Sequence, residues 1–170
     1  MNRPACALLA MLFLLAACDF PSSSPAKAEH SSKLGSGAHS PNPRQAEVEK
    51  VQAVLTPRIN FLAETYGEGT GSPCSSATSK LFTKSCAEMV DAVRDLADGI
   101  LESIDGKQGF GTLRRVSIAA QDSAASYKKL SCGTLPTSLD VQEECRKSGA
   151  VIAQSPADFH DGVNLGLAGL

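Results

Sequence analysis

The amino-acid sequence predicts an all-α protein whose folded part is an up-down four-helix bundle. Apolar residues recur at helical spacing in four successive segments, and no segment alternates apolar and polar residues as a half-buried strand does. Aromatic residues make up only 5% of the 170 residues, and tryptophan is absent. Alanine, leucine and valine must therefore fill the core, which suits packed helices better than a β-sandwich.

The first predicted helix covers about residues 44–66. Gly67 is a suitable C-terminal stop, because glycine readily adopts the left-handed conformation that ends many helices. Pro57 lacks a backbone donor, so we expect a kink there or a break before it. The apolar stripe of this helix comprises Val48, Val51, Leu55, Ile59 and Leu62.

The second predicted helix covers about residues 80–104, and Gly106 lies just beyond it. Ser85 and Glu88 match the S-x-x-E capping box, so the regular helix can begin as late as Cys86. Its apolar stripe comprises Met89, Val93, Leu96, Ala97, Ile100 and Ile104.

Two more helices are expected in the second half of the chain. The third covers about residues 112–131, with Thr112 as N-cap and Gly133 as a plausible stop. The fourth begins after residues 136–138, and Ser155-Pro156 is typical of a new helix start inside it. The apolar faces comprise Leu113, Val116, Ala120, Tyr127 and Leu130 in the third, and Val141, Cys145, Ile152, Phe159 and Val163 in the fourth.

The first eighteen residues have the features of an export signal. A basic start at Arg3 precedes an apolar run over residues 5–15, which is too short to span a bilayer but suits a signal peptide. The run ends in Leu15-Ala16-Ala17-Cys18, which resembles the lipobox of bacterial lipoproteins. The resemblance implies acylation of Cys18, with chains such as palmitate, and cleavage just before it. A plain secretory signal and an uncleaved anchor are the alternatives.

Three parts of the chain are therefore expected. Residues 1–17 are the signal peptide, and residues 18–43 are the lipidated cysteine and a disordered tether rich in Ser, Pro, Gly and Ala. Residues 44–170 form the helical domain. The resemblance implies a location outside the cytoplasm, on the extracytoplasmic side of a cell membrane, with inner and outer membrane both open.

Four cysteines remain in the helical domain. An even number in an oxidising compartment predicts two disulfides. The spacings C-x11-C and C-x12-C are longer than those of zinc sites, and no histidine is near, so metal binding is disfavoured. An up-down bundle places both loops at one end, which favours the local pairs Cys74–Cys86 and Cys132–Cys145 and leaves crossed pairs open.

An acidic row is the most regular charged feature of the sequence. Its carboxylates recur at steps of three and four residues, so they share one face of the second helix, opposite the apolar stripe. The row could dock a cationic partner, or it could be an ordinary solvated face that Arg94, Arg114 and Arg115 partly neutralise. It comprises Glu88, Asp91, Asp95, Asp98, Glu102 and Asp105.

No motif in the sequence predicts catalysis, a metal or another cofactor. Asp158, His160 and Asp161 form the only cluster of histidine and carboxylates, but no nucleophile accompanies them. The net charge of −2 does not suit a nucleic-acid binder.

The expected function is therefore a non-catalytic binding module of the bacterial cell envelope, with a membrane lipid anchor and a protein partner. Inhibitor, immunity and exclusion roles all fall in this class. A carrier of a small apolar ligand, held in a cavity between the helices, is the alternative. An enzyme is the least favoured class, because the sequence contains no nucleophile–base pair.

Overall fold

The computed structural model describes residues 43–168 of the chain, and these residues fold as four helices without any strand. The all-α prediction is therefore confirmed. The expected signal peptide and Cys18 lie outside the described residues, as does the expected tether except for Pro43, which begins the first helix. The helices are α1 (Pro43–Tyr66), α2 (Lys84–Ser103), α3 (Gly111–Lys129) and α4 (Leu139–Ala168), with short 3-10 turns η1 (Gly69–Gly71) and η2 (Ser79–Phe82) between α1 and α2.

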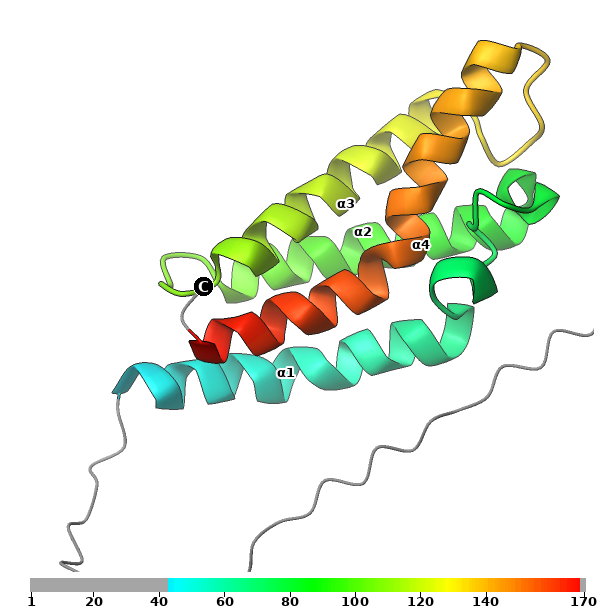
Figure 1. Ribbon diagram of the computed structural model, residues 1–170. Coiled ribbons are helices and arrows are strands. Elements are labelled where there is room, and N and C mark those ends of the chain that lie inside the picture. Colours follow the sequence, from blue (N-terminus) through cyan, green and yellow to red (C-terminus); the bar gives the residue numbers. More distant parts are fainter. Residues whose placement is uncertain (1–42, 169–170) are drawn as a thin grey trace, which may run out of the picture. The chain divides into compact units, whose positions relative to one another are not determined.

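Successive helices run in opposite directions, as in an up-down bundle (Figure 1). Helix α4 is the central element, since it contacts α1, α2 and α3. Helix α1 packs more extensively against α4 than against α2. The packing between α1 and α2 is therefore sparser than the packing between α1 and α4.

The predicted apolar stripes form the core. All five stripe residues of α1 are buried, and α2, α3 and α4 each contribute further buried apolar side chains. Alanine, leucine, isoleucine and valine dominate the core, as expected from the scarcity of aromatic residues. The largest buried side chains include Tyr127, Phe110, Phe159, Leu55, Ile59, Leu81 and Met89.

Glycines in α4 allow its neighbours to approach closely. A Cβ atom on Gly162 would lie 2.8 Å from the Cα atom of Leu113 in α3, which is closer than atoms can pack. A Cβ atom on Gly149 would lie 2.2 Å from a methyl group of Leu81 and 2.9 Å from the carbonyl oxygen of Cys74. The fit of α4 against α3 and against the α1–α2 connection therefore requires these glycines.

The ends of α1 agree with prediction, but its proline behaves differently. Gly67 has a φ of +71° and its N–H donates to the carbonyl of Ala63, so it ends the helix as expected. The expected break at Pro57 is absent, because α1 continues through this residue as one helix. Packing of the buried stripe on both sides of Pro57 holds the helix together across the missing hydrogen bond.

The predicted cap of α2 is wrong. Helix α2 begins at Lys84 after Thr83, whose backbone is extended, so Ser85 lies inside the first turn. Glu88 pairs with Lys84 at 3.1 Å instead of closing a capping box.

The predicted ends of α3 are also wrong. Phe110 occupies the N-cap position, and Thr112 lies inside the helix. At the other end Ser131 takes the left-handed conformation, with a φ of 55°, in the position where glycine is usual. The N–H of Cys132 then donates to the carbonyl of Tyr127 at 3.1 Å, so α3 ends before Gly133. The disulfide that follows directly holds this turn in place.

Helix α4 is one helix and not two. It continues through Pro156, where the sequence favoured a new start. Figure 1 shows a bend near the middle of α4, and a proline inside a helix causes such a bend by removing one hydrogen bond and crowding the preceding turn. The bend allows the second half of α4 to run along α1.

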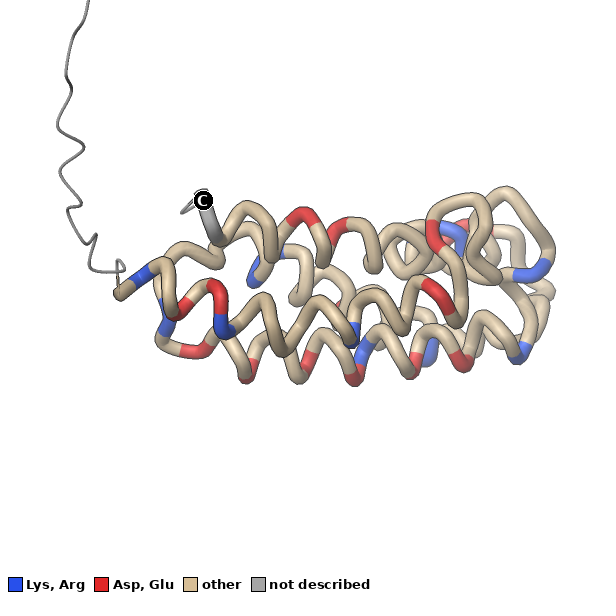
Figure 2. Tube along the Cα trace, turned by 90° about the horizontal axis from the view of Figure 1, so that it is seen from below, with Lys and Arg blue, Asp and Glu red and all other residues tan. Residues whose placement is uncertain are grey.

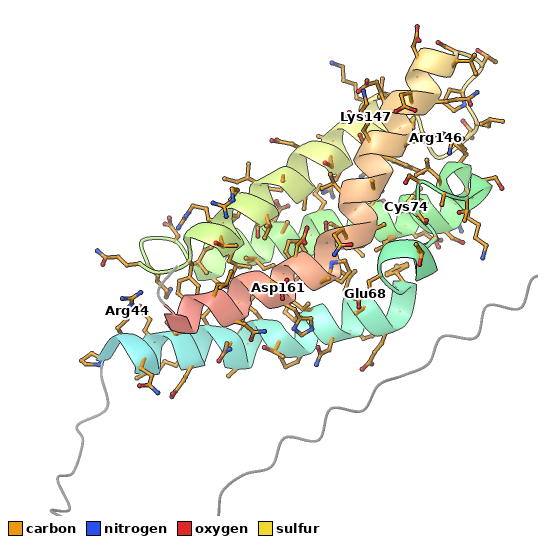
Figure 3. The ribbon with its side chains drawn as sticks, in the orientation of Figure 1. Arg44, Glu68, Cys74, Arg146, Lys147 and Asp161 are labelled. Carbon is orange, nitrogen blue, oxygen red and sulfur yellow. A yellow bond between two sulfur atoms is a disulfide. The ribbon has the colours of Figure 1, made fainter. Side chains whose placement is uncertain are left out.

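Both disulfides have the predicted local pairing, Cys74–Cys86 and Cys132–Cys145. The two stapled regions also meet at one end of the bundle, where Arg146 of α4 and Cys74 lie close in view (Figure 3). The Arg146 guanidinium donates to the carbonyl of Ser76 at 2.7 Å and lies 5.6 Å from the ring centre of Phe82. The Tyr127 hydroxyl donates to the carbonyl of Leu81 at 2.6 Å. These contacts tie the α1–α2 connection to α3 and α4.

None of the described helices combines the length and the apolar character that crossing a membrane requires.

Removing the second disulfide should weaken the fold measurably. Replacing Cys132 and Cys145 together by Ala opens a closed loop of this size, which should cost about 3 kcal/mol of unfolding free energy. Urea unfolding followed by circular dichroism measures the loss. An unchanged unfolding free energy would show that the turn after α3 holds without the staple.

The stability should also fall at alkaline pH because of Tyr127. Burial raises the pKa of Tyr127 from 10.0 to about 12, and the ionised oxygen could no longer donate to Leu81. Stability that is fully present below pH 10.0 is therefore lost as the pH rises through about 12. Across this pH range the melting temperature should fall more steeply with pH for the native chain than for Tyr127→Phe. Equal slopes would contradict the assignment.

Candidate functional site

The predicted acidic row does lie along one edge of α2. Acidic positions recur along an edge of the bundle with basic positions among them (Figure 2). Five of the six carboxylate residues are exposed, and Asp91 is half-buried. The geometry of the row is therefore as the sequence predicts.

Three of the six carboxylates of the row form ion pairs within the chain, and a fourth accepts a hydrogen bond from a neutral amide. Lys84 pairs with Glu88 at 3.1 Å, and Arg94 pairs with Asp95 at 2.9 Å. Lys128 pairs with Asp91, and the Gln121 amide donates to Asp98. Two carboxylates, Glu102 and Asp105, have no partner among the described residues. The acidic row is thus a weak candidate for a surface that docks a cationic partner.

The expected neutralising residues on α3 do not reach the row. The Arg114 guanidinium donates to the carbonyl of Ile104 at 2.8 Å, so it caps the end of α2 instead. Arg115 donates to the Thr112 hydroxyl at 3.3 Å. The sequence placed both arginines on the helix that follows the acidic row but did not identify these partners.

Asp158, His160 and Asp161 all lie on the second half of α4. Partial burial raises the pKa of Asp158, the negative charge of Asp161 raises it further, and a hydrogen bond from Gln154 opposes both effects. Asp161 is exposed on the second half of α4 (Figure 3). Among residues 43–168, no three His, Cys, Asp or Glu side chains come together as metal ligands.

An apolar groove lies on the seam between α1 and α2. One hollow of about 370 Å³ occupies the half of the seam near the end of α1. Its walls are mostly apolar side chains of both helices. They are formed by Pro57, Arg58, Phe61, Leu62, Tyr66, Ala92, Asp95 and Leu96.

A second hollow of about 360 Å³ continues along the same seam toward the start of α1. Its walls are more polar and include Glu47, Lys50 and Lys107 as well as Val51 and Val54. We call the two hollows together the α1–α2 groove. It follows two helices for most of their length.

Two large apolar side chains of α1 stand exposed at the α1–α2 groove. Phe61 is 69% exposed and Val54 is 57% exposed, although both belong to a helix whose other apolar face is fully buried. They are seven residues apart and Pro57 lies between them, so the three share one side of α1. This second apolar stripe is the feature that our sequence analysis missed. Its signal was present in the spacing, but the stronger buried stripe obscured it.

Other hollows and apolar side chains are less suited to binding. A hollow of about 420 Å³ between α2 and α3 is lined by Asp91 and Lys128, which pair with each other there. Leu135 and Leu139 are 64% and 78% exposed, on the connection and helix start enclosed by the second disulfide. The α1–α2 groove alone among these features combines a hollow with adjoining exposed apolar side chains.

Comparison of the chain with models of protein families, with curated proteins and with solved structures finds no match.

Proposed function

We propose that this protein is a lipid-anchored, non-catalytic docking module of the bacterial cell envelope, and that its binding surface is the α1–α2 groove. The observation that carries the proposal is the exposed stripe of Val54 and Phe61 beside an apolar hollow. Large apolar side chains that adjoin a groove are typical of protein interaction sites.

The shape of the α1–α2 groove favours a helical segment of the partner. The groove runs along two antiparallel helices, and an amphipathic helix binds such a surface through apolar residues spaced one and two turns apart. Val54 and Phe61 are spaced two turns apart and match this pattern. Covering a phenylalanine side chain completely contributes roughly 1.5–3 kcal/mol, so Phe61 is the expected anchor of the interface.

The lipid anchor rests on the resemblance of Leu15-Ala16-Ala17-Cys18 to a lipobox. Acylation of Cys18 would confine the domain to the membrane surface, and a random chain as long as the expected tether spans roughly 25–30 Å on average. A partner in the same compartment then meets the domain at a raised effective concentration. The anchor and the groove therefore serve the same docking role.

A small apolar ligand is the alternative occupant of the α1–α2 groove. The hollow of about 370 Å³ has the volume of a small-molecule site. Small-molecule sites, however, enclose most of their ligand, whereas this hollow is one part of a longer groove with Phe61 standing out at its edge. We therefore favour the protein partner.

Replacing Cys18 by Ser should release the protein from the membrane fraction. The native chain should incorporate labelled palmitate and sediment with membranes, because acylation requires the cysteine thiol. Fractionation and labelling in a bacterial host measure both properties. Membrane association that persists in Cys18→Ser would indicate an uncleaved anchor instead.

A photo-reactive amino acid at position 61 should cross-link to one dominant protein in intact cells. The same group at Ala119, an exposed residue of α3, serves as the matched control. Val54→Asp should reduce the adduct at position 61, because a buried carboxylate in the groove opposes docking. Mass spectrometry identifies the adducts.

Two results would contradict docking in the α1–α2 groove. One is an identical set of adducts at positions 61 and 119, which would indicate random collisions. The other is an adduct at position 61 that Val54→Asp leaves unchanged.

A further inference from the structure

A single arginine crosses the α1–α2 groove. Arg58 of α1 reaches over Gly99 of α2, and a Cβ atom on Gly99 would lie 2.7 Å and 2.9 Å from the two terminal nitrogens of its guanidinium. Only a glycine at position 99 leaves the guanidinium room to lie this close to the α2 backbone. Arg58 also lines the larger hollow, next to Pro57 and Phe61.

The guanidinium of Arg58 has no hydrogen-bonding or ionic partner among residues 43–168. The one carboxylate that lines this hollow belongs to Asp95, and it already accepts two hydrogen bonds from Arg94, at 2.9 and 3.3 Å. The other basic residues of α2 and α3 mostly have partners of their own, such as Lys84 with Glu88. Arg58 is therefore an uncommitted cation set among apolar side chains.

We propose that Arg58 is the specificity-determining residue of the α1–α2 groove, and that it selects a partner helix carrying one carboxylate beside its apolar anchor. This inference rests on the proposed function. The carboxylate of the partner binds the guanidinium of Arg58, and the adjacent apolar side chain covers Phe61. The partner thus brings an acidic and an apolar group to neighbouring positions of one helix.

The chemistry of the groove explains why the selected group is a carboxylate. A guanidinium presents two parallel N–H donors that match the two oxygens of a carboxylate. Arg58 is exposed in the free chain, and a partner helix that covers it would exclude water and strengthen the pair. A neutral partner that covered Arg58 would leave a buried charge without a counter-ion, which is costly. The groove therefore discriminates against partners that lack the carboxylate.

The acidic residue beside Arg58 disfavours further carboxylates of the partner at this point of the groove. Asp95 lies one turn before Gly99 on α2 and lines the same hollow as Arg58, whereas Lys50 and Lys107 line the second hollow. A partner helix with several carboxylates at this point would be repelled by Asp95, whereas basic residues on its outer side would be attracted. The groove thus fits a helix with one acidic group facing Arg58.

Two matched fluorescent probes test the role of Arg58 directly on the full chain. Anilinonaphthalene sulfonate joins an aromatic body to one anionic group, and phenylnaphthylamine is the same body without the charge. The native protein should bind the sulfonate more tightly than the neutral probe. Arg58→Gln should lower the affinity for the sulfonate about fivefold and leave the neutral probe unchanged, as expected for a partly exposed ion pair.

Three further variants separate the role of Arg58 from a general effect on the fold. Arg58→Lys should retain part of the preference for the sulfonate, because lysine keeps the charge but lacks the two parallel N–H donors of a guanidinium. Arg115→Gln removes an exposed arginine of α3 and should change neither affinity. Gly99→Ala should displace the guanidinium and weaken the sulfonate preference while raising the melting temperature, because alanine favours a helix over glycine.

The inference is overturned if the native protein binds both probes equally, or if Arg58→Gln and Arg115→Gln have the same effect on the sulfonate. A cross-link at position 61 that survives Arg58→Gln would reject the selection by Arg58 and leave docking in place. Loss of all cross-linking together with a retained sulfonate preference would reject the protein partner and assign the groove to a small anionic amphiphile.

Discussion

The close packing of α4 against its neighbours determines which seams of the bundle are filled. Gly162 lets the backbone of α3 approach α4, and Gly149 does the same for Leu81 in the α1–α2 connection. Tyr127 and Arg146 then fix that connection by hydrogen bonds to its carbonyl groups. Because α4 also takes up the buried stripe of α1, little is left to draw α1 and α2 together. The α1–α2 groove is therefore open because the closest contacts of the bundle are those that α4 makes with its neighbours.

Charge and apolar surface have separate roles on this molecule. The acidic row of α2 is the most regular charged feature, yet Lys84, Arg94, Lys128 and Gln121 satisfy four of its six carboxylates. Such exposed pairs contribute little to stability, but the three ion pairs neutralise half of the charges of the row. Phe61 differs from these carboxylates, since an exposed phenylalanine side chain gives up no ion pair or hydrogen bond when a partner covers it. The binding that we propose for this surface thus depends on apolar contact, with one arginine for selectivity.

The sequence predicted the features that rest on periodicity and missed those that rest on three-dimensional contacts. Helical spacing correctly located four helices, their buried stripes and the local pairing of the disulfides. The capping box at Ser85 was wrong because Thr83 provides the extended residue before α2. Pro57 and Pro156 did not break their helices, since tertiary packing outweighs one lost hydrogen bond. The groove itself depends on the sparse packing of α1 against α2, and no pattern within a single helix reports how two helices pack.

Radical footprinting in intact cells tests the central claim, that the α1–α2 groove is the working surface, without any substitution in the chain. Oxidation of Phe61 would be compared between the purified protein and the protein in intact cells, with Leu135 and Leu139 as exposed internal references. Docking in the groove predicts that Phe61 becomes protected in cells while the two leucines keep their reactivity. Equal oxidation of Phe61 in both settings would contradict the claim, and protection of the leucines alone would move the binding surface to the disulfide end of the bundle.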